Sequence, residues 1–446
     1  MKKITREKFI EIKEIIVFTV LFIWILMPVC ECIDKLYIIF VLDNYKLILM
    51  AITGAIGILF GIWFILKKIK EDKIKSKKEI LPIFIFLIYM IWTLIACIFS
   101  PNKKLAFWGT EYRRDGYLMY IIYAGYFFCA YLLESKELRK MLLNLFTGVS
   151  VFLIIMSKIS LILLQYTDVF TYSIDSSVFF QFNHYGYYLM MSLMCCFGLL
   201  ISEKNKILKI VYLALYTLIS YALIFNNTFG RYLATSIILI VWCLYTLLKK
   251  KDRKITLIAI SIFILLSAIV TKDGKNVAFE NISSFGGDIK TIITKVLKID
   301  ENNPELEEDF EKAGTSRMLL WKNGVKFIKE RPIIGYGPEN LEEKYASVSI
   351  DQDRPHNLLI QLATTSGIPG MILYIVAVGI IVIRGIKNLI NNNDTGKIFL
   401  IVIVTYLISA MFGNSMYYTS PYYFIFLGFL MNCNRHKQKD KPTEEQ

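Results

Sequence analysis

The segment ILPIFIFLIYMIWTLIACIF, residues 80–99, decides the fold class because it is long, apolar and free of charged side chains. An α-helix rises about 1.5 Å per residue, so a segment of this length spans the roughly 30 Å hydrocarbon core of a bilayer. Similar blocks recur along the chain of 446 residues, of which 55% are apolar, 14% aromatic and 20% charged. This pattern excludes a soluble globular enzyme, a disordered protein and a secreted disulfide scaffold. It also excludes a transmembrane β-barrel, whose strands alternate apolar and polar residues.

We therefore predict an all-α polytopic membrane protein with about twelve transmembrane helices, counting apolar blocks of about 17 residues or more. The predicted spans are residues 14–32, 47–66, 80–99, 116–133, 141–163, 184–201, 208–225, 232–248, 255–271, 357–383, 398–413 and 419–432. The segment before the first span is basic but is not followed by a small-residue cleavage site, so we interpret the first span as a retained anchor.

Lys and Arg residues indicate the orientation of the chain, because they gather in alternate short connections such as KKIKEDKIKSKK (residues 67–78). Basic residues favour the cytoplasmic side, so both termini are predicted to be cytoplasmic. This placement also explains the net charge of +14 without a nucleic-acid partner. The composition is rich in Ile, Lys and Asn and suggests an AT-rich bacterial genome, so we expect a multi-pass protein of a bacterial cytoplasmic membrane.

The spans divide the chain into three predicted regions: an N-terminal membrane region (1–271, spans one to nine), a large extracytoplasmic loop (272–355), and a C-terminal membrane region (356–446) with the last three spans and a cytoplasmic tail. A loop of this length is usually functional or disordered.

Within the loop, an amphipathic helix is predicted from residues that recur at helical spacing and end at Arg331-Pro332, ahead of a Gly-Tyr-Gly turn at residues 335–337. The recurring residues are Met318, Trp321, Val325 and Ile328. In the tenth span, Gly367, Pro369 and Gly370 either break the helix or allow close helix packing. The sequence leaves both interpretations open.

Five groups of polar residues fall on the predicted outer face, and ionisable residues near spans default to a functional interpretation. They are WGTEYRRDG (108–116) with Arg113 and Arg114, FNHYG (182–186), NNTFGR (226–231) with Arg231, GTSR (314–317) with Arg317, and DRPHNLL (353–359) with His356 and Asn357.

Each group also has a purely structural interpretation. Arg113 and Arg114 suit an interfacial anchor, the histidine of FNHYG suits a helix end, and Arg231 suits snorkelling to lipid headgroups. Arg317 can pair with a local carboxylate, with Ser316 or Thr315 capping its helix, and His356 can pack at a helix end.

Together the groups place cations, a histidine and an amide around one outward-facing site. A guanidinium matches phosphate oxygens in geometry and charge, so the arginines suit a diphosphate leaving group. A histidine with a near-neutral pKa suits deprotonation of an acceptor hydroxyl. The eight cysteines lie in or at the ends of apolar blocks, and no zinc spacing or metal constellation is visible. We therefore expect metal-independent chemistry and no cofactor, although Asp353 and Glu111 leave a metal possible.

Two segments between Ser316 and Val376 resemble the O-antigen ligase and O-antigen polymerase superfamily of bacterial polysaccharide enzymes. They are SRMLLWKNGVKFIKERPIIGYGPENL and PHNLLIQLATTSGIPGMILYIV. Three further motifs are similar to family patterns: NNTFGR, YRRDG and FNHYG. The first departs from the commoner pattern, because Phe229 stands where that pattern has Ser or Thr before the Gly-Arg step. The resemblance extends from about residue 109 to about residue 370.

The resemblance implies a C-type glycosyltransferase fold and a metal-independent enzyme. Such an enzyme takes a glycan from an undecaprenyl-diphosphate carrier on the outer membrane face. By this resemblance Arg231 and Arg317 would hold the diphosphate, with Arg113 or Arg114 assisting, and His356 would activate the acceptor hydroxyl or orient it with Asn357. The expected partners are the lipid-linked oligosaccharide, an acceptor glycan or lipid, and membrane lipids.

Two questions stay open at this stage. A ligase moves a finished glycan to a different acceptor, whereas a polymerase adds a growing chain to another carrier-linked repeat unit. The composition favours a polymerase, because it suggests an organism without lipopolysaccharide.

The alternative class is a solute transporter or flippase, which twelve spans would suit. Transporters often show internal repeats and polar residues near the membrane midplane; here the two halves show no repeat, and the polar groups gather at one face.

Overall fold

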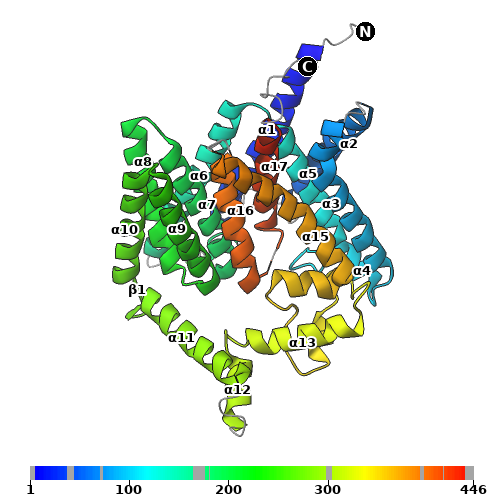
Figure 1. Ribbon diagram of the computed structural model, residues 1–446, viewed down its shortest axis with the longest axis vertical. Coiled ribbons are helices and arrows are strands. Elements are labelled where there is room, and N and C mark those ends of the chain that lie inside the picture. Colours follow the sequence, from blue (N-terminus) through cyan, green and yellow to red (C-terminus); the bar gives the residue numbers. More distant parts are fainter. Residues whose placement is uncertain are drawn as a thin grey trace.

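The computed structural model describes residues 6–37, 45–70, 74–163, 176–179, 181–297, 304–391, 396–414 and 416–436, and these residues form a bundle of α-helices (Figure 1). The predicted all-α polytopic class is confirmed. A two-residue strand, β1 (Thr271–Lys272), pairs antiparallel with β2 (Lys275–Asn276) where the membrane helices give way to the long loop.

Each of the predicted spans falls on a helix. The N-terminal region contains α1 (Arg6–Tyr37), α2 (Tyr45–Lys70), α3 (Ile74–Ile98), α4 (Lys103–Trp108), α5 (Tyr117–Leu132), α6 (Lys136–Leu163), α7 (Phe182–Ser202), α8 (Lys206–Phe225), α9 (Phe229–Lys249) and α10 (Arg253–Ile269). The remaining helices are α11 (Val277–Val296), α12 (Pro304–Lys312), α13 (Arg317–Glu330), α14 (Glu342–Ala346), α15 (Leu358–Ile390), α16 (Lys397–Ser409), the 3-10 turn η2 (Ala410–Phe412) and α17 (Ser420–His436). Within the described residues, eight helices are long and apolar enough to cross a membrane, and α5 and α16 are shorter apolar helices.

The centre of the bundle is formed by helices that are buried on nearly all sides, chiefly α5, α7 and α17. Glycines allow α2 and α5 to touch at the backbone, because a Cβ atom on Gly57 would lie 2.1 Å from the carbonyl oxygen of Gly125. Small residues permit such close contacts between membrane helices. The result is a closely packed interior, and the polar groups of the candidate site lie at the ends of its helices.

Helix α15 is broken near its start, which answers the question that the sequence left open. Gly367 has a left-handed φ of 72°, and the chain continues as a second helical segment. The loop after α13 fills the break: the N–H groups of Tyr336 and Gly337 donate to the carbonyls of Thr364 and Thr365, both at 2.8 Å. Backbone groups released by the break are thereby satisfied, as burial near a membrane requires.

Helices α11 to α13 lie together at the end of the bundle opposite to the chain termini (Figure 1). The predicted amphipathic helix is confirmed as α13, which ends at Glu330. The prediction of its buried face was wrong in detail, because Leu320, Gly324 and Phe327 face inward while Val325 is 44% exposed. Phe327 packs against Tyr345 of α14, which places the buried stripe one residue away from the predicted one.

Candidate functional site

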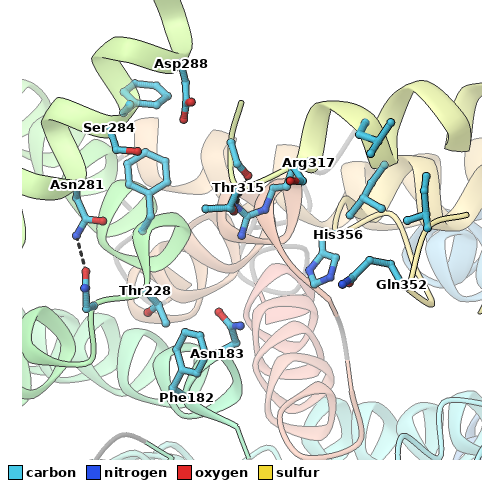
Figure 2. A pocket seen from close by; sticks show the side chains of 18 residues that line it. Phe182, Asn183, Thr228, Asn281, Ser284, Asp288, Thr315, Arg317, Gln352 and His356 are labelled. Atoms are coloured by element: carbon cyan, nitrogen blue, oxygen red, sulfur yellow. Dashed lines mark hydrogen bonds between the residues drawn. The ribbon is translucent and has the colours of Figure 1, made fainter. Parts of the chain in front are cut away.

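A cavity of about 560 Å³ opens between the long loop and the helix ends that face it (Figure 2). It is bounded by α11, the start of α13, the start of α7, the α8–α9 turn and the segment before α15. Arg317 and His356, which are more than thirty residues apart in sequence, both line it. Its polar lining also includes Asn183, Asn227, Thr228, Asn281, Ser284, Asp288, Thr315, Ser316 and Gln352.

Arg317 is the first residue of α13 and reaches into this cavity (Figure 2). Its Nη1 donates to the Gly314 carbonyl at 2.8 Å and to the Thr315 hydroxyl at 2.7 Å, and its Nε has no hydrogen-bond partner among the described residues. Burial and the nearby Arg231 lower the pKa of Arg317, while Asp288 across the cavity opposes that effect. The proposed caps were wrong, since the side chains of Ser316 and Thr315 make no cap hydrogen bond to α13.

Arg231 lies one helical turn beyond the cavity residue Thr228 and is only 2% exposed. Its guanidinium carbon is 3.8 Å from the centroid of the Tyr187 ring, and its Nη1 donates to the Phe412 carbonyl at 3.3 Å. No carboxylate pairs with it within the described ranges. The geometry does not fit snorkelling, because the guanidinium points into protein instead of toward headgroups. A buried cation without an anionic partner is costly, so a bound anion near Arg231 and Arg317 would be stabilising.

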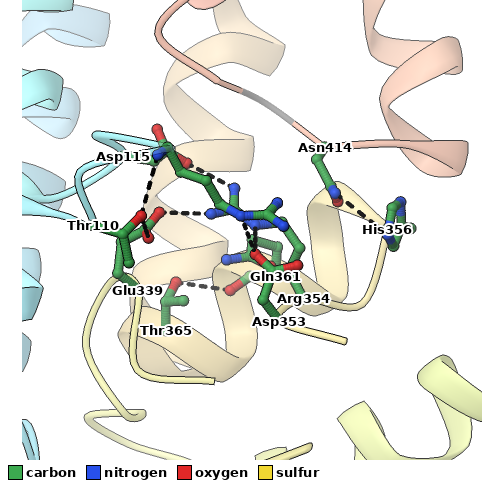
Figure 3. A network of polar contacts seen from close by, with 10 residues as sticks. Thr110, Asp115, Glu339, Asp353, Arg354, His356, Gln361, Thr365 and Asn414 are labelled. Atoms are coloured by element: carbon green, nitrogen blue, oxygen red, sulfur yellow. Dashed lines mark hydrogen bonds and ion pairs between the residues drawn. The ribbon is translucent and has the colours of Figure 1, made fainter. Parts of the chain in front are cut away.

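His356 adopts a left-handed backbone conformation with φ 52°, which turns its imidazole into the cavity. Its Nε2 lies 3.4 Å from the Asn414 amide nitrogen (Figure 3). Burial lowers the pKa of His356 to about 4, and the positive charge of Arg317 contributes in the same direction. The imidazole is therefore neutral near pH 7 and can accept a proton.

Asn357 occupies the N-cap of α15 and does not line the cavity. Its Oδ1 accepts from the N–H groups of Leu359 and Ile360 at 3.0 and 3.1 Å, and its Nδ2 donates to the Met411 carbonyl at 3.1 Å. These bonds occupy the amide and fix the start of the helix. Asn357 therefore follows His356 in the chain but does not face the cavity with it.

Arg113 and Arg114 also lie outside the cavity lining. The Arg113 Nε forms an ion pair with Asp353 at 2.7 Å. Arg114, with φ 50°, donates from its Nε to the Glu111 carbonyl at 2.9 Å. Arg113 therefore contacts the segment that carries His356, and no contact of either arginine points toward a diphosphate in this cavity.

Arg354 is a central residue of the site that the sequence reasoning missed (Figure 3). It is 2% exposed and pairs with three carboxylates: Asp353 at 2.8 Å, Asp115 at 3.2 Å and Glu339 at 2.5 Å. Burial raises the pKa of Asp115 to about 7, although Arg354 opposes this shift. The only signal in the sequence was the position of Arg354 beside Pro355 and His356, because its partners come from distant segments.

The segment 353–357 is consequently held from several sides. Arg113 binds Asp353, Arg354 joins the loop before α5 to the loop after α13, and the Trp321 Nε1 donates to the Pro355 carbonyl at 2.9 Å. These contacts fix the backbone on both sides of His356. In contrast, His184 is buried and does not line the cavity, which agrees with its structural interpretation.

Residues 213–375 match a family model described as O-antigen ligase. The match covers less than half of the chain, and over these residues the chain is similar to the O-antigen ligase family. The match confirms the superfamily indicated by the sequence motifs, and it includes Arg231, Arg317 and His356. It supports a membrane protein that processes glycans in the manner of an O-antigen ligase or polymerase. No curated protein matches the chain.

Proposed function

We propose that this protein is a metal-independent membrane glycosyltransferase that uses an undecaprenyl-diphosphate-linked glycan on the outer membrane face. The observation that carries the proposal is the pairing of Arg317 and a neutral His356 in the lining of one cavity, with the buried Arg231, which has no carboxylate partner among the described residues, one helical turn beyond the cavity residue Thr228. The family match covers all three residues.

Transfer of the glycan breaks the bond between its anomeric carbon and the diphosphate oxygen, and the electron pair leaves with the diphosphate. The acceptor hydroxyl forms the new bond to that carbon, and its proton passes to His356. Arg317 and Arg231 stabilise the developing negative charge of the leaving group, the largest contribution that such a site can make. Binding of the diphosphate also offsets the charge of Arg317, so it raises the pKa of His356 and strengthens it as a base.

The remaining predicted residues do not line the cavity but stabilise the segments next to it. Asn357 holds the first turn of α15, and Arg113 holds Asp353, so we propose that both position His356 and do not bind substrate. Arg114 contributes to the same loop through Glu111. A cavity with polar walls at one end of the bundle favours transfer chemistry over a transport path, which would place polar residues near the membrane midplane.

We favour a polymerase over a ligase, and the size distribution of surface glycan distinguishes them. Cells should be compared that carry the wild-type protein, Arg317→Ala, His356→Ala, or the control Lys326→Ala on the exposed face of α13. We expect both site variants to insert normally and to lose product, while the control keeps it. Collapse to single repeat units indicates a polymerase, and full-length chains left on the carrier indicate a ligase. Unchanged glycan in both site variants would overturn the proposal.

A further inference from the structure

A further buried arginine lies at the opposite end of the bundle from the candidate site. Arg139, in the first turn of α6, is 5% exposed. Its partners are neutral: the Asn432 Oδ1 at 2.5 Å, the Glu134 carbonyl at 3.3 Å and the Cys433 sulfur at 3.5 Å. No ion pair joins Arg139 to a carboxylate in the part of the chain that the structure describes. Because a buried charge is costly without a counter-charge, this residue indicates a missing anion.

Arg139 lines a cavity of about 340 Å³ between α6, the end of α7 and the start of α16. Lys136 and Lys140 line it too, and their spacing of three and one residues from Arg139 puts all three cations on one side of the helix. The acidic residue of the lining, Glu203, pairs with Lys140 at 2.8 Å and accepts from the backbone N–H groups of residues 204 and 205. The lining therefore carries an excess of two positive charges.

One part of the lining is an apolar wall that consists of Leu143, Leu199, Ile398 and Phe399. Cations next to an apolar wall match a molecule with an anionic head and a hydrocarbon chain. The cavity lies where three membrane helices begin or end, at the end of the bundle that carries the chain termini (Figure 1). Phosphate headgroups of a bilayer lie near the ends of membrane-spanning helices, and basic pockets between such helices bind headgroups.

We propose that this cavity is a binding site for an anionic glycerophospholipid, with its phosphate at Lys136, Arg139 and Lys140 and one acyl chain along the apolar wall. Free phosphate shares the charge but not the chain, so it would leave the apolar wall uncovered. The proposal concerns a site apart from the glycan cavity and does not depend on the proposed transferase activity.

The test is native mass spectrometry of the purified full-length protein with phosphatidylglycerol or phosphatidylcholine. The double variant Lys136→Gln/Lys140→Gln removes two cations and leaves Arg139, whose bonds to α17 support the fold. Both lysines are exposed, so the variant should unfold at nearly the wild-type temperature without added lipid. The matched control is Lys249→Gln/Lys250→Gln, two exposed lysines that do not line the cavity.

We expect the wild-type protein to retain phosphatidylglycerol in preference to phosphatidylcholine. The double variant should bind phosphatidylglycerol about tenfold more weakly or worse, because each lysine near a headgroup contributes about 1 kcal/mol. The control should bind it as the wild type does. Equal retention of both lipids, or equal weakening in the control, would overturn the proposal. So would displacement of phosphatidylglycerol by inorganic phosphate at low concentration, which would identify a free-phosphate site.

Discussion

At the scale of single residues, the pKa of His356 makes a direct prediction about pH. Burial and Arg317 lower it to about 4 in the unliganded protein, so the imidazole is protonated only in acid. We expect kcat/KM, which reports the free enzyme, to hold down to about pH 5 and to fall as the pH approaches 4. The acid limb of kcat should lie at higher pH, because a bound diphosphate neutralises part of the positive charge around His356.

The measurement is a pair of pH profiles with lipid-linked donor. Acid limbs of kcat and kcat/KM that coincide would contradict the idea that an anion binds beside His356. An acid limb of kcat/KM above the ordinary histidine pKa of about 6.5 would contradict the burial of this imidazole. The same shift acts on stability: the unfolded chain binds a proton at higher pH than the folded chain, so this residue reduces stability as the pH falls from about 6.5 toward 4.

Arg354 gives a second prediction at the residue scale. Replacing it by Gln leaves Asp115 and Glu339 buried without their cation, a change that typically costs roughly 3–5 kcal/mol of stability. Adding Asp115→Asn to Arg354→Gln should recover part of the loss, because one unpaired carboxylate disappears. Thermal unfolding of the wild type, both single variants and the double variant measures this coupling. Strictly additive effects would show that Arg354 and Asp115 do not interact in the folded protein.

At the scale of elements, the break in α15 predicts a contrast between two glycines of one helix. A Cβ on Gly367 would lie 2.0 Å from the Ile333 carbonyl oxygen, and its φ of 72° disfavours any side chain. Gly367→Ala should therefore displace the loop at residues 332–337, destabilise the protein by about 2 kcal/mol or more, and reduce transferase activity. The measurements are the thermal unfolding midpoint and product yield.

Gly379→Ala is the matched control, since no atom lies within 4 Å of a Cβ built there. Removing a glycine from a helix interior stabilises by roughly 0.5–1 kcal/mol, so this variant should be as stable as the wild type or slightly more so. If Gly367→Ala behaved like Gly379→Ala, the loop insertion at the break would be refuted.

The helices also show which features could be predicted from the sequence and which could not. Hydrophobic blocks predicted each of the eight described helices that are long and apolar enough to cross a membrane, and periodicity predicted α13 and its end at Arg331, because these features depend on neighbouring residues. The buried face of α13 and the insertion at Gly367 depend on which distant loop packs there, so local pattern could not choose between the alternatives. For the same reason Arg317 and His356 were singled out as motif residues, whereas Arg354 was missed and the ion pair between Arg113 and Asp353 was not foreseen.

At the scale of the whole molecule, the distribution of charge predicts which end faces the cytoplasm. Lys and Arg gather at the helix ends near the start of α1, including the last turn of α2 (Lys67, Lys68 and Lys70) and residues 249–254 after α9, while α11 to α13 lie at the other end of the bundle. Basic connections are retained on the cytoplasmic side. The candidate glycan cavity would then face outward, where a flipped lipid-linked glycan is available, and the proposed phospholipid site would face the cytoplasmic leaflet.

Cysteine labelling tests this orientation. Lys326 lies on α13, Lys250 follows the end of α9, and both are exposed. The starts of α9 and α13 line the same cavity, so the 21 residues of α9 carry Lys250 away from α13 to the other end of the bundle. The eight native cysteines lie within or beside apolar helices. A membrane-impermeant maleimide should label Lys326→Cys in intact cells and Lys250→Cys only after the membrane is permeabilised, with the wild-type protein as the blank. The reverse pattern would place His356 and Arg317 in the cytoplasm, where a donor on the outer face could not reach them, and would exclude the proposed transferase reaction together with the predicted topology.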